Sequence, residues 1–409
     1  MIRRTTSSPA CPSRSRRAAH ISAIVAIVAA LCTLPACTQY EPFDSVQHLE
    51  NQYATQLGPA ERTADVSVPF ALDPAIIETL ETYYKPSPNE LRRVDQTLHL
   101  IFERVGLEYA LLPTRSAVDT YQSGYGNCLS FVNLFVGVGR HLRLNPFYVE
   151  VTDYQRWNVQ DGQVVSRGHI VAGMYVKGEL RTFDFLPYAP KAYKDFNPVD
   201  DLTASAHHYN NLGAEALLRG ELDDAIRWLD VAVQLAPTFA KALNNRGVAY
   251  ARVGELDRAI EIYRQGLVDA PENVELLTNL ARAYQIQGKS DIAQETLAQI
   301  DTVHNTNPFF FVYKGEQALA SGDTDAALEA MRDALKRDSE VPEVHLGLTK
   351  VYLARGEVRR ARHHLSRALR LDATHPEARR YAAMIGDGDE GVDGDVAPAA
   401  ADDGPGTRR

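Results

Sequence analysis

Three side chains in the first half of the sequence could carry out thiol chemistry. Cys128 follows the turn-forming stretch Gly124-Tyr125-Gly126-Asn127, and apolar residues with helical spacing come after it. The thiol is therefore expected in the first turn of a helix. The free backbone N–H groups and the positive end of the helix dipole at that place favour the thiolate, which is the nucleophilic form. Cys128 is the candidate nucleophile.

A nucleophilic thiol needs a base, and the base needs an acceptor that orients it. Residues 168–176 and 179–186 predict two strands joined by a turn. A turn of two residues would place His169 and Asp184 on the same face of this hairpin as diagonal neighbours, whereas a bulge at Gly178 would separate them. With the two-residue turn, the imidazole of His169 and the carboxylate of Asp184 would lie side by side.

This order of residues resembles the transglutaminase-like domain of the papain-like cysteine enzymes. In that family a Cys at a helix N-terminus is followed along the chain by a His and an Asp on adjacent strands. The resemblance covers residues 69–200 and implies an α+β fold there. It implies that Cys128 is the nucleophile, that His169 is the general base and acid, and that Asp184 orients the imidazole.

The resemblance leaves several features of the site open. In that family an aromatic residue often follows the Cys, and Ala-Trp often follows the His. This chain has Leu129 after Cys128 and Ile170 after His169, so the resemblance does not identify the particular substrate. The backbone N–H of Cys128 and the side chain of Gln122 are the candidate donors to an oxyanion. The alternative is that Cys128 is a small buried residue and His169 a satisfied polar group, in a fold that has lost catalysis.

The first 36 residues have the composition of an export signal. Five arginines and no acid precede an apolar run over residues 21–34, and small residues follow. The motif Leu-Pro-Ala-Cys that ends at Cys37 resembles the lipobox of bacterial lipoproteins, which implies that Cys37 is acylated. An uncleaved signal anchor over residues 18–34 is the alternative. Residues 37–68 are polar and would form a tether between lipid and domain.

Export would leave Cys128 as the only free thiol of the mature chain, because Cys11 and Cys32 lie in the signal and Cys37 would carry lipid. An unpaired thiol is a liability in an oxidising compartment, which favours a functional role for it. Thr38 follows the lipidated residue, and the absence of Asp there favours the periplasmic face of the outer membrane of a Gram-negative host.

The charge of the chain excludes one class of function. The formal net charge is −10, and loss of the signal would remove five arginines and make the mature chain more negative still. Such a chain does not favour nucleic acid, and it would be repelled by anionic lipid headgroups. Membrane contact is therefore expected through the lipid at Cys37 alone.

Residues 206–375 show an internal repeat with a period of 34 residues. The recurring residues are Gly220, Gly254, Gly288, Gly322 and Gly356, and also Ala225, Ala259, Ala293, Ala327 and Ala361. The pattern resembles five tetratricopeptide repeats, in which the glycine ends the first helix of a pair and the alanine lets the second helix approach its neighbour. Residues 376–385 predict a capping helix, and residues 386–409 predict a disordered acidic tail.

The first helices of such a solenoid line its concave side, where partners bind. The residues expected there are His207, Asn210, Lys241, Asn244, Arg282, Phe309 and Lys350. Their mixed chemistry favours an extended peptide over a strongly charged motif. No cofactor and no metal is expected, because the acidic residues near the C-terminus lack the spacing of an EF-hand.

The sequence thus predicts an exported lipoprotein with an α+β transglutaminase-like domain and an all-α tetratricopeptide solenoid. The thiol would hydrolyse a peptide or side-chain amide or transfer its acyl group, while the repeats bind a periplasmic protein. The alternative is a non-catalytic periplasmic adaptor or scaffold with a degenerate transglutaminase-like fold.

Overall fold

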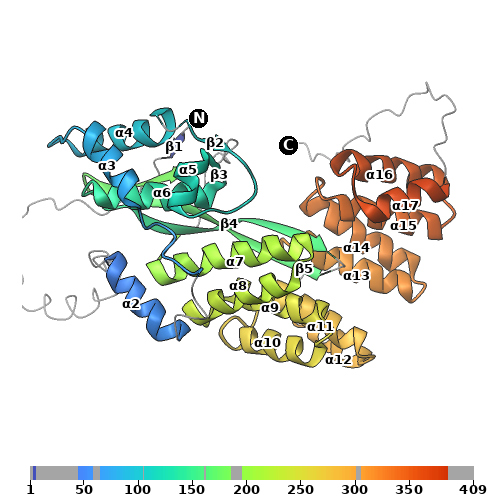
Figure 1. Ribbon diagram of the computed structural model, residues 1–409. Helices are drawn as coiled ribbons and strands as arrows, with labels where there is room; N and C mark the ends of the chain where they lie inside the picture. Colours follow the sequence, from blue (N-terminus) through green and yellow to red (C-terminus); the bar gives the residue numbers. More distant parts are fainter. Residues whose placement is uncertain are drawn as a thin grey trace, which may run out of the picture. The chain divides into compact units, whose positions relative to one another are not determined.

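The computed structural model describes residues 3–5, 45–58, 65–104, 106–160, 163–185, 196–300 and 305–385 (Figure 1). Cys37 and the predicted acidic tail lie outside the described residues, as does almost all of the predicted export signal. No helix in the described part of the chain is long and apolar enough to span a membrane.

The chain forms two compact units, Met1–Asn305 and Thr306–Arg409. The α+β elements share the first unit with the first helix pairs of the repeat region, so the units do not divide at the predicted domain boundary near residue 200. That position marks instead the start of the first repeat helix, α7 (Asp201–Arg219).

An antiparallel sheet with the strand order β1-β6-β5-β4-β7 forms the centre of the α+β part. Its strands are β1 (Arg3–Thr5), β4 (Phe147–Gln160), β5 (Gln163–Val176), β6 (Glu179–Asp184) and β7 (Phe196–Val199). Strand β1 falls within the predicted export signal and pairs with β6 at one edge of the sheet. The sheet supplies two of the three predicted site residues, one on β5 and one on β6.

Helices lead along the chain to the thiol, and the last of them, which begins at the thiol, packs against β5 and β4. They are α2 (Val46–Leu57), α3 (Pro74–Tyr83), α4 (Glu90–His99) with the π-turn η2 (Leu100–Arg104), α5 (Ala117–Ser123) and α6 (Cys128–His141). A short parallel pair, β2 (Glu108–Tyr109) and β3 (Tyr125–Gly126), fixes the segment just before α6. Phe131 and Phe135 of α6 pack against Phe183 and Phe185 in a buried aromatic cluster.

The hairpin between β5 and β6 has the register that the sequence predicted. Ala172 pairs with Phe183 and Val176 with Glu179, and the two-residue turn between the strands contains no bulge. Both turn residues have positive φ, 54° at Lys177 and 82° at Gly178, which matches the twist of the strands. The parity of this ladder keeps His169 and Asp184 on one face of the hairpin.

The rest of the described chain consists of helix pairs. In the first unit they are α7/α8 (Leu222–Leu235), α9 (Ala240–Arg252)/α10 (Leu256–Asp269) and α11 (Val274–Ile286)/α12 (Ser290–Leu297). In the second unit they are α13 (Pro308–Ala320)/α14 (Thr324–Arg337) and α15 (Pro342–Ala354)/α16 (Val358–Leu371), followed by α17 (Pro376–Ile385).

The repeat signature is confirmed in each pair. The five recurring glycines all have positive φ, between 73° and 90°, where the first helix of the pair ends. The five recurring alanines are buried, so a larger side chain at these positions would separate the helices. The predicted capping helix is α17.

A buried ion pair joins α6 to α7. Arg140 donates to both carboxylate oxygens of Asp201, at 2.7 and 2.8 Å, and its Nε donates to the carbonyl of Pro146 at 3.2 Å. The side chains of Arg140 and Asp201 are only 11% and 6% exposed. Since a buried carboxylate must be paired, this contact fixes the first repeat helix to the helix that begins at Cys128.

We expect Arg140→Leu to lower the free energy of unfolding by about 3–5 kcal/mol, because Asp201 would remain buried without this partner. The matched control is Arg219→Leu, whose ion pair with Glu221 is 53% and 46% exposed. That change should cost no more than about 1 kcal/mol. Urea unfolding of the full chain measures both. Equal losses in the two variants would contradict a structural role for the buried pair.

Candidate functional site

Cys128 is the first residue of α6, as the sequence predicted. The helix begins with a capping box: Asn127 Oδ1 accepts the Ser130 N–H at 3.0 Å, and Ser130 Oγ accepts the Asn127 N–H at 3.3 Å. This arrangement sets the start of the helix at a defined residue. The thiol therefore lies at the positive end of the helix dipole and remains partly accessible.

His169 is brought together with both of its predicted partners. Its Nε2 lies 3.2 Å from Asp184 Oδ2, and its side chain also hydrogen-bonds Cys128. His169 and Asp184 are 5% and 7% exposed. The three residues, called the thiol site below, thus form a connected group in which the imidazole stands between thiol and carboxylate.

The imidazole in this group is positively charged at neutral pH. Burial alone would lower the pKa of His169, but hydrogen bonds to Asp184 and Cys128 and the charges of both groups raise it from 6.5 to about 9. The arrangement therefore places a proton donor next to the Cys128 side chain.

The structure does not place Gln122 as an oxyanion donor. Gln122 is exposed on α5, and its Nε2 donates to Asp73 Oδ2 at 3.1 Å. Asp73 is the N-cap of α3, so the Gln122 amide ties two surface helices together. The role of Gln122 as an oxyanion donor stays a prediction. The backbone N–H of Cys128 stays the candidate donor.

The sequence did not predict a buried polar network that is centred on Asn133 of α6. Asn133 Oδ1 accepts the hydroxyl proton of Tyr148 at 2.9 Å, while its Nδ2 donates to the Arg115 carbonyl at 3.2 Å and lies 3.3 Å from His208 Nδ1. Burial lowers the pKa of His208 from 6.5 to about 4, against the attraction of Asp119, so this imidazole is neutral. The sequence feature that could have indicated this network is the asparagine inside the apolar stretch Phe131-Val132-Asn133-Leu134-Phe135.

The predicted partner groove is covered in the first unit by the chain itself. Strand β5 lies against α7, α9 and α11, the first helices of the first helix pairs (Figure 1). Of the residues expected to read a partner, His207, Asn210 and Asn244 are buried. Asn210 Oδ1 accepts from Asn245 Nδ2 and Asn244 Oδ1 from Asn279 Nδ2, both at 2.8 Å, so these amides join successive helices.

Lys241 also serves an internal contact. Its ammonium group pairs with Glu150 on β4, and His207 Nε2 lies 3.8 Å from the same carboxylate. Burial lowers the pKa of His207 to about 4, with Glu150 opposing and Lys241 reinforcing the shift. His207 is thus neutral at pH 7, and Lys241 is the cation that balances Glu150. This contact fastens the β4–β5 hairpin to α9.

The remaining groove residues are half-buried or buried. Arg282 is half-buried on α11, and Phe309 is buried on α13. Lys350 on α15 forms ion pairs with Glu316 at 3.3 Å and with Glu377 of α17 at 3.0 Å. The two ion pairs of Lys350 join α15 to α13 and to α17 within the second unit.

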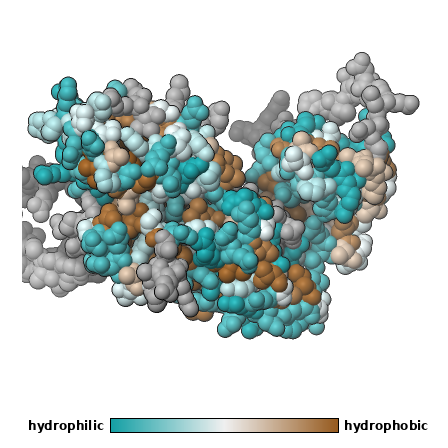
Figure 2. Space-filling view, in the orientation of Figure 1, coloured by the Kyte–Doolittle hydropathy of each residue, from teal (hydrophilic) through white to brown (hydrophobic). Residues whose placement is uncertain are grey.

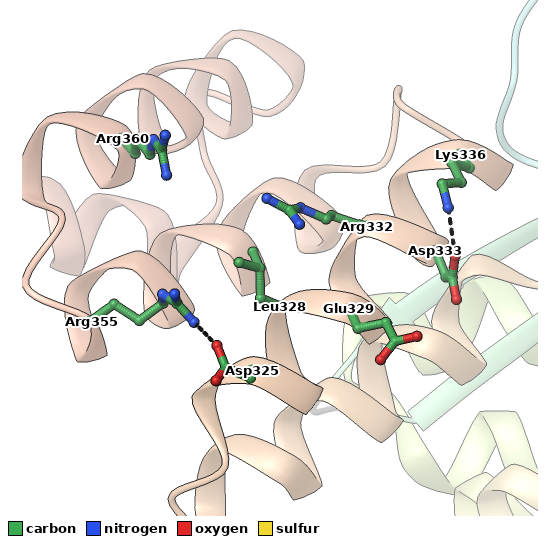
Figure 3. Close-up of a pocket in the computed structure, with 8 residues that line it drawn as sticks. All are labelled: Asp325, Leu328, Glu329, Arg332, Asp333, Lys336, Arg355 and Arg360. Carbon is green, nitrogen blue, oxygen red and sulfur yellow. Dashed lines mark hydrogen bonds and ion pairs between the residues drawn. The ribbon is translucent and has the colours of Figure 1, made fainter. Parts of the chain in front are cut away.

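A hollow of about 530 Å³ lies on α14 and the neighbouring ends of α15 and α16 (Figure 3). Its lining residues are Asp325, Leu328, Glu329, Arg332, Asp333, Lys336, Arg355 and Arg360. Two of its cations are paired across or along it, Arg355 with Asp325 and Lys336 with Asp333 (Figure 3). Acidic and basic groups alternate, so the hollow does not select a ligand of one charge.

Hydrophobic side chains also reach the surface over α10, α11 and α12 (Figure 2). Val268, Ile286 and Ile292 are exposed there among hydrophilic residues. Apolar residues scattered in this way are ordinary on protein surfaces and do not mark a docking face.

Comparison with known proteins identifies the helix pairs. Two tetratricopeptide repeat models match residues 240–283 and 318–385. No curated protein matches the sequence. Solved structures with a similar fold include a thermophilic tetratricopeptide protein of Thermus thermophilus, which is 19% identical (44% of this chain and 98% of that one, TM-score 0.40).

Two further solved structures are similar to part of this chain. One is pilF of Pseudomonas aeruginosa, at 22% identity over 44% of this chain and 84% of that one, with a TM-score of 0.36. The other is MamA 41-end from Desulfovibrio magneticus RS-1, at 19% identity over 42% and 97%, with a TM-score of 0.31. On the evidence of the family models, this chain contains tetratricopeptide repeats.

Proposed function

We propose that the thiol site performs thiol-dependent acyl chemistry on an amide, in a protein whose tetratricopeptide repeats contact a protein partner. One observation carries the proposal: the imidazole of His169 hydrogen-bonds both the Cys128 thiol and the Asp184 carboxylate. A nucleophile, a base and an orienting group that interact in this order are what covalent catalysis by a thiol requires.

The reaction proceeds in two steps. The Cys128 thiolate adds to the amide carbonyl carbon, and the His169 imidazolium gives its proton to the leaving nitrogen as the C–N bond breaks. This releases an amine and leaves a thioester on Cys128. Neutral His169 then takes a proton from water, the water oxygen forms the new C–O bond, and the carboxylic acid leaves as the thiolate is restored. Asp184 keeps the imidazole oriented throughout.

Hydrolysis is the preferred outcome because bacterial members of the transglutaminase-like family are often hydrolases. An amine in place of water would give acyl transfer by the same steps. The substrate class is a peptide bond or a side-chain amide, since these are the carbonyl groups whose leaving nitrogen needs the proton that His169 holds.

A non-catalytic scaffold is the second candidate function. The family matches at residues 240–283 and 318–385 favour it, since tetratricopeptide repeats suggest protein–protein interaction. In this case the α+β part is a degenerate transglutaminase-like fold that supports the solenoid. The two candidates differ in one measurable property, the reactivity of Cys128.

We also propose that the chain is exported as a lipoprotein and held at the periplasmic face of the outer membrane. The support is the composition of residues 1–36 and the Leu-Pro-Ala-Cys motif. Partners of the repeats would then be periplasmic proteins or peptides.

The first test is the rate of Cys128 alkylation by iodoacetamide between pH 5 and 9, followed by mass spectrometry of the Cys128 peptide. We expect the wild type to react about tenfold faster than His169→Ala at pH 6, because the imidazolium stabilises the thiolate. His141→Ala is the matched control, as His141 is exposed at the other end of α6. Equal rates in wild type and His169→Ala would favour the scaffold.

The charge of His169 should also appear in the pH dependence of stability. Its pKa is raised from 6.5 to about 9 in the folded chain, so its contribution is fully present below pH 6.5 and is lost as the pH rises through 9. Relative to His169→Gln, the wild type should therefore lose on the order of 1–3 kcal/mol between pH 6 and pH 9.5. Urea unfolding at these two pH values measures the difference. A difference that grows with pH would show that the folded state holds His169 neutral.

Lipidation has its own test in a Gram-negative host. The mature protein should begin at Cys37 and carry the mass of the attached lipid, which intact-mass spectrometry of the membrane fraction detects. Cys37→Ala should abolish both the lipid and the cleavage before residue 37. A wild-type protein that keeps residues 1–36 would instead support the signal anchor.

A further inference from the structure

A line of buried hydrogen bonds runs from the first repeat helix to the start of α6. Glu215, on α7, accepts two hydrogen bonds at Oε1, from the Thr114 N–H at 2.8 Å and from the Thr114 hydroxyl at 2.6 Å. Thr114 Oγ1 in turn accepts from Asn127 Nδ2 at 2.7 Å. Asn127 is the N-cap of the helix that begins with Cys128. The line thus ends at the residue next to the thiol.

The donors and acceptors along this line have one consistent order. Glu215 Oε1 is an acceptor, so the single hydroxyl proton of Thr114 points toward it. The oxygen of that hydroxyl is then left to accept from Asn127, which requires the NH₂ group of the Asn127 amide to face Thr114. The amide oxygen of Asn127 must therefore face the helix, where it accepts the Ser130 N–H at 3.0 Å and the Ser130 hydroxyl at 2.9 Å.

Burial makes this order obligatory. Glu215 is 2% exposed, and Thr114, Asn127 and Ser130 are buried as well. Water therefore has little access to replace a lost partner. A flipped Asn127 amide would set two acceptors against each other at Thr114 and two donors against each other at the Ser130 N–H. Without the acceptor at Glu215, the hydroxyl of Thr114 is free to turn, and the NH₂ group of Asn127 no longer has an acceptor that is held in a fixed orientation.

We propose that Glu215 is a positioning residue of the thiol site. Through Thr114 it holds the Asn127 cap in the orientation that sets the first turn of α6, and so it fixes the Cys128 sulfur relative to His169. The effect on thiol chemistry rests on the proposed function, whereas the effect on the cap does not. The first tetratricopeptide helix is then a structural part of the site.

The other side of α7 belongs to the repeats. Asn210 of the same helix accepts from Asn245 of α9 at 2.8 Å, and β5, which carries His169, lies against α7. A displacement of α7 would consequently move the acceptor at Glu215 together with the packing of the next repeat. Helix α7 therefore couples the position of the repeats to the position of the Cys128 sulfur.

The test compares Glu215→Ala, Glu215→Gln and Thr114→Val in the full chain. Two quantities are measured: backbone hydrogen exchange in the segment 127–135, and the pH profile of Cys128 alkylation by iodoacetamide. We expect Glu215→Ala and Thr114→Val to speed exchange at the start of α6 and to remove most of the roughly tenfold rate advantage at pH 6. Glu215→Gln should keep both, because its amide oxygen can still accept from Thr114.

Tyr209→Phe is the matched control. The Tyr209 hydroxyl, also on α7, donates to the Ser67 carbonyl at 2.6 Å and accepts the Ser67 N–H at 2.9 Å. The substitution therefore removes hydrogen bonds between α7 and the N-terminal segment without touching the line to Asn127, and it should leave exchange in segment 127–135 and alkylation unchanged.

The outcomes separate this inference from the proposed function. If Glu215→Ala and Thr114→Val behave as Tyr209→Phe does in both measurements, Glu215 does not position the cap and the inference is overturned. If exchange rises in these variants but the wild-type thiol is already unreactive at pH 6, Glu215 orders the cap and the proposed chemistry fails instead. Thr114→Val retains the hydrogen bond from the Thr114 N–H to Glu215. This variant therefore tests the inference if Glu215→Ala does not fold.

Discussion

The N-terminus of α6 is buried, and the rest of the first unit depends on how that burial is satisfied. A helix begins with N–H groups that have no acceptor within the helix, and burying them without partners is costly. Here Asn127 and Ser130 cap each other, Thr114 holds the cap, and Glu215 closes the network from α7. The geometry that leaves the thiol at the end of a helix dipole is thus supplied partly by residues far along the chain.

This dependence explains why the α+β elements and the first helix pairs form one compact unit. The Arg140–Asp201 ion pair and the Asn133–His208 contact join α6 to α7 at two further places. Each contact buries polar or charged groups that lose their partners if the helices separate. A boundary drawn where the repeat period begins, near residue 200, therefore describes the sequence pattern and not the packing.

Local rules in the sequence predicted the parts of the site that local chemistry determines. Glycines and an asparagine before an apolar helical run located Cys128 at the start of α6, and strand parity across a two-residue turn placed His169 and Asp184 together. The 34-residue period located the ends of the repeat helices. Glu215 could not be found in this way, because its role is defined by a contact with Thr114 across 101 residues. The contact between Gln122 and Asp73 could not be found either, because it joins residues that are 49 positions apart.

The groove predictions illustrate a different limit. The repeat pattern identifies which residues lie on the first helices, and it did so for His207, Lys241 and Asn244, but it does not identify what covers them. Glu150 of β4 pairs with Lys241, so the hairpin that carries His169 on its second strand is fastened to the concave side of the repeats. Strand β5 therefore carries His169 and also packs against the repeat helices. A change in how β5 lies on α9 and α11 would therefore shift the position of His169 through the backbone of the strand. No ligand at the thiol would be needed for this shift.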